Sequence, residues 1–144
     1  MSSLTLKQAN TIISKGFEKA REMKVKPLGI VVLDASGHII SAQREDGASM
    51  FRLDVAKGKA WAAVAMGASS RALLKRSKDN PAFFVTLAAT AEGKFLPQTG
   101  AALIKDKSGN ILGAAGGSGG TGDEDEACCV HGIEQAELVP DAKE

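Results

Sequence analysis

Residues 111–126 read ILGAAGGSGGTGDEDE, a run that joins an apolar strand to a glycine-rich turn and then to four consecutive carboxylates. Six of the ten residues 113–122 are glycine. Glycine occurs where the backbone needs a positive φ, or where a ligand or another backbone must approach without a Cβ between them. We expect a strand, a turn and a helix here, with the backbone of residues 116–122 as the best place for a ligand, although close packing alone would also require glycine.

Two known motifs can be read in this segment. Residues 117–122 match the G-x-G-x-x-G of dinucleotide-binding folds, but that motif needs a second parallel strand after the helix, and only 22 residues follow Gly122. The carboxylates of residues 123–126 would also repel a pyrophosphate. Residues 116–120 match the G-x-S-x-G of a nucleophile elbow, yet His131 would then lie on the following helix instead of a later loop. A helix N-cap at Thr121 is the simpler interpretation.

Composition indicates one globular domain spanning residues 1–144, with 44% hydrophobic and 24% charged residues. A net charge of +1 without a basic run argues against nucleic acid or a membrane surface as partner. The N-terminal MSSLTLKQAN lacks the apolar core of a signal peptide, so we expect a cytoplasmic protein. Cys128 and Cys129 are neighbours, which excludes an intrachain disulfide framework.

The hydrophobic patterns alternate between helical and strand periods along the chain. A capping box at Thr5–Gln8 opens a helix that extends to about Met23, and an alanine-rich helix is expected at 53–67. A shorter helix should follow before Asn80-Pro81, and residues 83–90 are ambiguous between strand and a short helical turn, which we favour. Two hairpins are expected, at 28–44 and 100–115, with DASG and DKSG as their turns. This order predicts an α+β fold in which helices flank an antiparallel sheet.

Five segments match one known family: LTL (4–6), VLDASGH (32–38), REDGA (44–48), GKA (58–60) and GGSGGTGDEDE (116–126). In these segments the chain resembles the GlcG/HbpS family, small proteins that include the C-terminal domain of PduO-type corrinoid adenosyltransferases. The resemblance covers nearly the whole chain. It implies a profilin-like α+β fold, a homo-oligomer, and binding of haem or, by association, a corrinoid.

The segment Arg44-Glu45-Asp46-Gly47 comes directly after the second predicted strand, where a sheet end delivers side chains to a common rim. The guanidinium of Arg44 suits a carboxylate or propionate, and Lys59 would supply a second cation. With Asp46, Gly47 and Gly117-Ser118-Gly119, they form the predicted tetrapyrrole-binding site. The alternative is that Arg44 pairs with Asp46 or another carboxylate and that Gly47 only makes a turn.

Haem iron takes histidine, cysteine, methionine or tyrosine as a ligand, and this chain has two histidines and no tyrosine. His38 and His131 are therefore candidate axial ligands. At helical spacing, Glu124, Cys128 and His131 share one face of the last helix, which makes them a candidate metal or subunit-contact stripe, while Cys129 falls on the apolar face. The alternatives are a solvated helix face for His131 and a rim position for His38.

Two functions of different classes remain open from the sequence. In the first, an accessory protein binds haem or a related tetrapyrrole in a pocket near the glycine-rich turn. In the second, a small enzyme acts on an organic acid, with Arg44 or Lys59 holding its carboxylate and Asp46 or Asp123 as the base. The lack of an unambiguous acid–base pair weakens the second.

Overall fold

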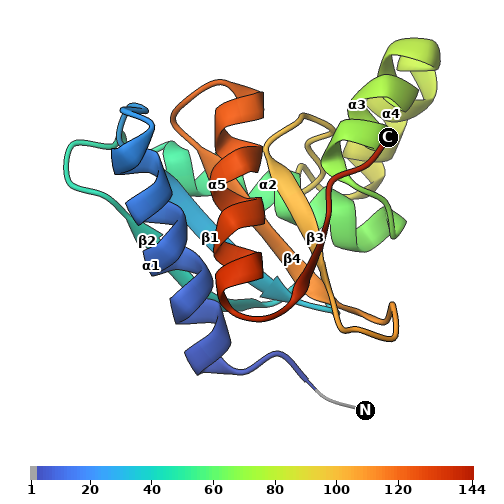
Figure 1. Ribbon diagram of the computed structural model, residues 1–144. Helices are drawn as coiled ribbons and strands as arrows, with labels where there is room; N and C mark the ends of the chain where they lie inside the picture. The colour runs from blue at the N-terminus through green and yellow to red at the C-terminus, as the bar shows by residue number, and fades with distance from the viewer. Residues whose placement is uncertain (1–2) are drawn as a thin grey trace.

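One five-stranded antiparallel sheet, in the order β2-β1-β4-β3-β5, organises the computed structural model, which describes residues 3–144 (Figure 1). The strands are β1 (Gly29–Asp34), β2 (Ile39–Arg44), β3 (Ala101–Lys105), β4 (Ile111–Ser118) and β5 (Val139–Asp141). The two predicted hairpins are β1–β2 and β3–β4, and they pair through the central contact of β1 with β4. The predicted α+β class is confirmed.

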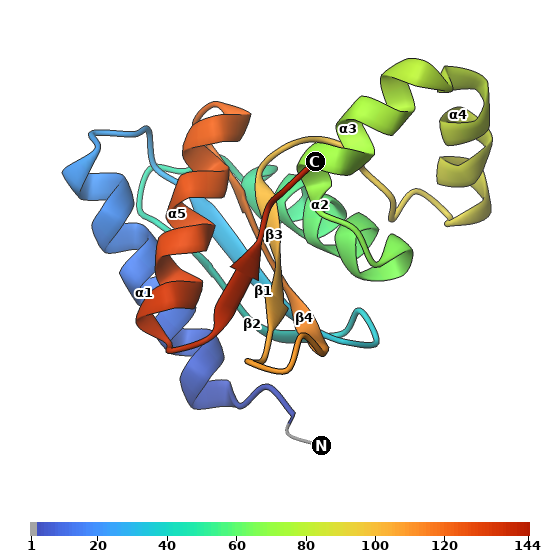
Figure 2. The same ribbon diagram turned by 45° about the vertical axis from the view of Figure 1, so that its right-hand side comes forward.

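Helices cover both faces of the sheet. The helices are α1 (Leu6–Glu22), α2 (Arg52–Met66), α3 (Ser70–Asp79), α4 (Pro81–Thr90) and α5 (Gly122–Gln135). Helices α1 and α5 lie side by side on one face, and α2 packs against the other (Figure 1). Helices α3 and α4 extend away from the sheet as an arm (Figure 2).

The alternation of side chains along β1 joins the two layers. Ile30 and Val32 point into the core beneath α1 and α5, whereas Val31 and Leu33 pack against the alanines of α2. All four side chains are fully or almost fully buried. A strand buried on both faces reads as a continuous apolar run, which is the pattern of residues 28–33.

Glycines at the end of β4 and just beyond it allow neighbouring backbone to approach closely. Strand β4 continues to Ser118, so residues 116–118, which we expected in a turn, are paired strand residues. A Cβ on Gly116 would lie 2.2 Å from the carbonyl oxygen of Ala56 in α2, and one on Gly119 would lie 2.3 Å from that of Pro27. The turn itself is therefore shorter than predicted, and most of these glycines are explained by close contact with neighbouring backbone.

Two further differences concern short elements. Residues 81–90 form a full helix with Pro81 in its first turn, a position where the missing N–H costs nothing. Strand β5 pairs with β3, and the sequence patterns did not predict this strand. It includes Pro140, which a sheet tolerates on an edge strand because proline has no backbone N–H to donate. A strand of three residues is too short for its own pattern to predict it, because it forms only by pairing with the edge strand β3.

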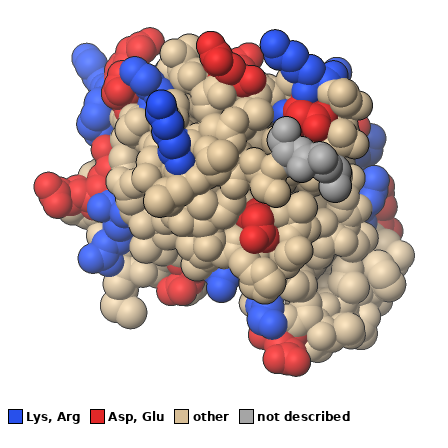
Figure 3. Space-filling model, turned by 90° about the horizontal axis from the view of Figure 1, so that it is seen from below, with Lys and Arg blue, Asp and Glu red and all other residues tan. Residues whose placement is uncertain are grey.

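Charges of both signs are interspersed on the end of the molecule that carries the hairpin turns (Figure 3). Positive and negative side chains lie mostly toward its edge, and no single-sign patch covers it, which agrees with the net charge of +1. Among residues 3–144, no helix combines the length and apolar character needed to cross a lipid bilayer.

Candidate functional site

The strand register brings three loops to the end of the sheet opposite the hairpin turns. Gly29 pairs with Arg44 on one side and with Ser118 on the other. The loops that enter β1, leave β2 and leave β4 therefore meet at this end. Four hollows lie along them, and the glycine-rich segment borders three.

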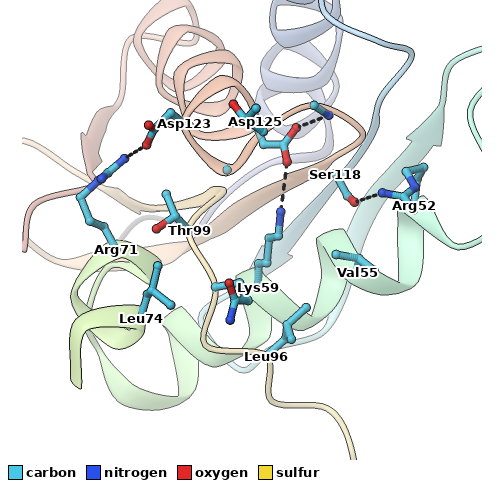
Figure 4. Close-up of a pocket in the computed structure, with 14 residues that line it drawn as sticks. Arg52, Val55, Lys59, Arg71, Leu74, Leu96, Thr99, Ser118, Asp123 and Asp125 are labelled. Atoms are coloured by element: carbon cyan, nitrogen blue, oxygen red, sulfur yellow. Dashed lines mark hydrogen bonds and ion pairs between the residues drawn. The ribbon is translucent and has the colours of Figure 1, made fainter. Parts of the chain in front are cut away.

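A cavity of about 450 Å³ lies between α2, α3 and the β4–α5 turn (Figure 4), and we call it the main cavity because three cations line it. Three cations from two helices line it together with carboxylates of α5 and a small apolar wall. Its lining includes Arg52, Val55, Lys59, Arg71, Leu74, Leu96, Ser118, Asp123 and Asp125. The cavity is open to solvent, so a ligand larger than a simple ion can enter it.

Lys59 and Asp125 form a buried ion pair at the base of this cavity. The Nζ of Lys59 lies 3.1 Å from Oδ2 of Asp125 and donates to the carbonyl of Gly117 at 3.0 Å. The other carboxylate oxygen, Oδ1, accepts from the backbone N–H of Gly120 at 2.9 Å. Gly100 makes room for the ammonium group, since a Cβ there would lie 2.5 Å from Nζ. The pair neutralises itself and ties α2 to the β4–α5 turn.

Arg71 connects α3 to the start of α5. Its Nε and Nη2 each lie 3.1 Å from a carboxylate oxygen of Glu126, and Nη2 also contacts Asp123. The hydrogen bond with Glu126 makes the largest contribution to raising the pKa of Arg71 above its ordinary value, and the hydrogen bond with Asp123 adds to it. Two carboxylates thus compensate this cation within the chain.

Arg52 differs from the other two cations. It is half-buried at the first position of α2, where its Nε donates to Ser49 Oγ and its Nη1 donates to Ser118 Oγ, both at 3.1 Å. Within the described part of the chain it makes no ion pair with a carboxylate. It also borders a second hollow of about 360 Å³ that contains Gly47 and Gly119. Of the three cations that line the main cavity, Arg52 is the one without a carboxylate partner among the described residues.

The predicted rim residues lie at this end of the sheet but in different hollows. Arg44 and Asp46 border a hollow of about 470 Å³ on the α1 side, and Arg44 is exposed. No ion pair between Arg44 and Asp46 is present; in that loop Glu45 pairs with Arg21 instead. Of the other predicted residues, Gly47 and Gly119 share the hollow beside Arg52, while Lys59 and Ser118 border the main cavity. Gly117 is buried in β4.

The candidate iron and metal ligands are not gathered at the cavity. His38 is exposed in the β1–β2 turn, at the opposite end of the sheet, and His131 lies half-buried on α5. Cys128 is fully buried in the core, so our prediction that it lies opposite the apolar face of α5, beside Glu124 and His131, is wrong. Helix α1 packs against α5 closely enough to cover it, with Gly16 beside the Cys128 carbonyl. Within residues 3–144, no group of three or more His, Cys, Asp or Glu side chains could hold a metal ion.

The cavity meets part of what haem requires. Arg52 suits a propionate, and Val55, Leu74 and Leu96 offer apolar contact for a ring edge. None of the residues that line the cavity is a histidine, cysteine, methionine or tyrosine, so the lining itself supplies no usual ligand for iron.

Comparisons with known proteins agree on the fold. The family model described as "Haem degrading protein HbpS-like" matches residues 4–134. No curated protein matches the sequence. A PduOC:haem complex superimposes with a TM-score of 0.85 at 23% identity, over 97% of this chain and 99% of that one. ORFY of Klebsiella pneumoniae gives 0.85 at 22% identity, over 95% and 92%. A double mutant of HbpS from Streptomyces reticuli gives 0.79 at 25% identity, over 93% and 87%.

Proposed function

The chain belongs to the HbpS-like family, and we propose that it is an accessory protein that binds haem in the cavity beside the β4–α5 turn. One relative of the same fold was solved as a haem complex, and the family description names haem. The observation that carries the proposal is Arg52, a half-buried guanidinium held by two serine hydroxyls without a carboxylate partner. Such a group favours a ligand that brings its own negative charge.

Arg52 would bind one propionate, with Ser118 fixing the orientation of the guanidinium from the end of β4 (Figure 4). Lys59 and Arg71 already have carboxylate partners, so they would form part of the cavity wall and attract a propionate less than Arg52 does. The porphyrin edge would contact Val55, Leu74 and Leu96. When bound, haem would supply the redox and ligand-binding chemistry of its iron. A corrinoid, in which amides replace most of the carboxylates, would use Arg52 less.

A titration of the protein with haemin, followed by the Soret absorbance, tests this proposal. We expect saturable 1:1 binding that weakens about 10- to 100-fold in Arg52→Ala, the loss that one charge-assisted hydrogen-bonded contact of about 1.5–3 kcal/mol implies. Arg76→Ala is the matched control, because Arg76 is exposed on α3 and does not line the cavity. Equal affinities for all three proteins, or equal losses in both variants, would contradict the assignment.

Enzymatic work on a small organic acid is the second candidate. The observation that favours it is the combination of a free cation, Arg52, with a cavity wall that has no usual iron ligand. A thermal-shift screen against small carboxylates separates the two, since a ligand at 100 times its dissociation constant stabilises the fold by about 2.7 kcal/mol. A carboxylate that stabilises the wild type but not Arg52→Ala, in a protein that does not bind haemin, would favour this second function.

We also infer that the protein forms a homo-oligomer through its α3–α4 arm. Helix α4 is largely apolar, and it leaves Phe83 49% and Val85 71% exposed. It packs within the chain mainly against α3. Sedimentation equilibrium should show an oligomer that Val85→Asp dissociates; a monomeric wild type would refute this inference.

A further inference from the structure

A second hollow adjoins the main cavity and shares one side chain with it. Its volume is about 360 Å³, and its lining consists of Lys26, Pro27, Gly47, Ala48, Ser49, Arg52 and Gly119. Arg52 lines both hollows, so this side chain lies where the two meet. A ligand that enters the main cavity and contacts Arg52 is therefore next to the second hollow.

The two hollows differ in chemical character. The main cavity has an apolar wall of one valine and two leucines. The second hollow is lined mostly by glycine and small side chains, and its largest apolar group is the ring of Pro27. Its charged side chains are Lys26 and Arg52, and none of the described residues that line it is an aspartate or a glutamate. This lining suits an acid group better than a porphyrin ring.

Contacts around Pro27 fix the position of Lys26. A Cβ on Gly119 would lie 2.3 Å from the carbonyl oxygen of Pro27, and one on Gly47 would lie 3.5 Å from its Cγ. The loops that leave β4 and β2 thus hold Pro27 between them. The carbonyl of Lys26 accepts a hydrogen bond from Nη2 of Arg21 at 3.3 Å. The backbone of Lys26 is therefore held at the border of the hollow, while its side chain stays exposed.

The ammonium group of Lys26 is not neutralised within the described chain. None of the ion pairs among residues 3–144 includes it. The nearby Glu45 pairs with Arg21, and Glu124 accepts from a backbone N–H at the start of α5. Asp46 borders the separate hollow on the α1 side. Two cations without a carboxylate partner in the described residues thus border the second hollow.

We propose that this site recognises the acidic edge of a flat ligand, with one carboxylate at Arg52 and a second at Lys26, and that iron contributes little to the affinity. The inference rests on the proposed function and names its ligand class, porphyrins with two neighbouring propionates, with or without a metal. Both cations border the same hollow, so two acid groups on one ring edge can contact them together. The lining of the main cavity contains no usual iron ligand, so it contacts the ring alone.

Three ligands test this inference: haemin, metal-free protoporphyrin, and protoporphyrin monomethyl ester, which keeps a single free propionate. In titrations of the wild type, we expect haemin and protoporphyrin to have dissociation constants within about threefold of each other. The monoester should bind about fivefold more weakly than protoporphyrin, the loss expected for one exposed ion pair.

The variants assign each acid group to its cation. Lys26→Ala should bind protoporphyrin about fivefold more weakly and should no longer distinguish it from the monoester. Arg52→Ala should weaken all three ligands by about tenfold or more. Lys78→Ala is the matched control, because Lys78 is exposed on α3 and lines neither hollow, and it should behave as the wild type.

The outcomes separate this inference from the function beneath it. A wild type that binds neither haemin nor protoporphyrin refutes the proposed function itself. A wild type that binds haemin more than about tenfold tighter than protoporphyrin leaves that function standing and overturns the minor role of iron. A Lys26→Ala variant that still distinguishes protoporphyrin from its monoester, or that behaves as Lys78→Ala does, overturns the assignment of the second acid group.

Discussion

Replacing Lys59 by methionine removes one partner of a buried ion pair and leaves the other without compensation. The Asp125 side chain is 1% exposed and that of Lys59 is 7% exposed, so water cannot take the place of the ammonium group. Asp125 would keep the N–H of Gly120 as its hydrogen-bond donor. Breaking a pair of this kind by deleting one charge costs about 3–5 kcal/mol of unfolding free energy. For a chain of 144 residues this corresponds to a melting temperature lower by about 10 °C or more.

Urea unfolding, followed by the fluorescence of the single tryptophan, Trp61, measures this loss. The double variant Lys59→Met with Asp125→Asn removes both charges and should be more stable than Lys59→Met alone by about 2 kcal/mol. Lys57→Met, on the same helix and without an ion pair in the described residues, should change stability by less than about 0.5 kcal/mol. A loss below about 1 kcal/mol in Lys59→Met, or a double variant whose losses simply add, would refute the reasoning.

Three further predictions concern packing, surface charge and the thiols. Gly116→Ala should destabilise the protein by about 3 kcal/mol or more in thermal unfolding, because its Cβ would meet a backbone oxygen at 2.2 Å, whereas Gly117→Ala, whose nearest neighbours would be at 3.4 Å, should cost less than about 1 kcal/mol. Similar losses for both would contradict the account of β4. Arg71→Ala should cost only about 1 kcal/mol in 50 mM salt and less in 1 M salt, since Arg71 is 33% exposed; a loss independent of salt would contradict this. Cys128 and Cys129 should both resist a thiol reagent at pH 8 until the protein unfolds, because burial first, and then nearby charged groups, raise the pKa of each; rapid labelling of the native protein would show that one is accessible.

Local chemistry explains which parts of the fold could be predicted. The capping box of α1 forms with Thr5 and Gln8 as expected, and Thr121 caps α5 in the same way. In the DASG turn, Asp34 accepts from the backbone N–H groups of Ser36 and His38, and Asp106 repeats this arrangement in the DKSG turn. These contacts join residues at most four apart, so the sequence pattern contains all the partners.

The site depends on contacts between distant segments, which no local pattern contains. Arg52 reaches Ser118 and Lys59 reaches Asp125 across 66 residues in each case. Four consecutive carboxylates gave no reason to single out Asp125, yet the phase of α5 buries it while leaving Asp123 79% exposed. The sequence analysis missed Arg52 because its partner Ser118 lies far away in the chain, so no local pattern marks it as a site residue.

The misplacement of Cys128 has a related cause. Helical spacing defines one apolar face on α5, but α5 has two neighbours, the sheet and α1, and their combined contact covers more of its surface. Gly132 shows how close α1 lies, since a Cβ there would be 2.2 Å from the carbonyl oxygen of Ile12.

A crystal structure of the protein with haemin tests the central claim most directly. It should show a propionate within hydrogen-bonding distance of the Arg52 guanidinium, with the porphyrin between α2 and the β4–α5 turn. Haem seated at the hairpin end on His38, or elsewhere on the surface without contact to Arg52, would contradict the claim.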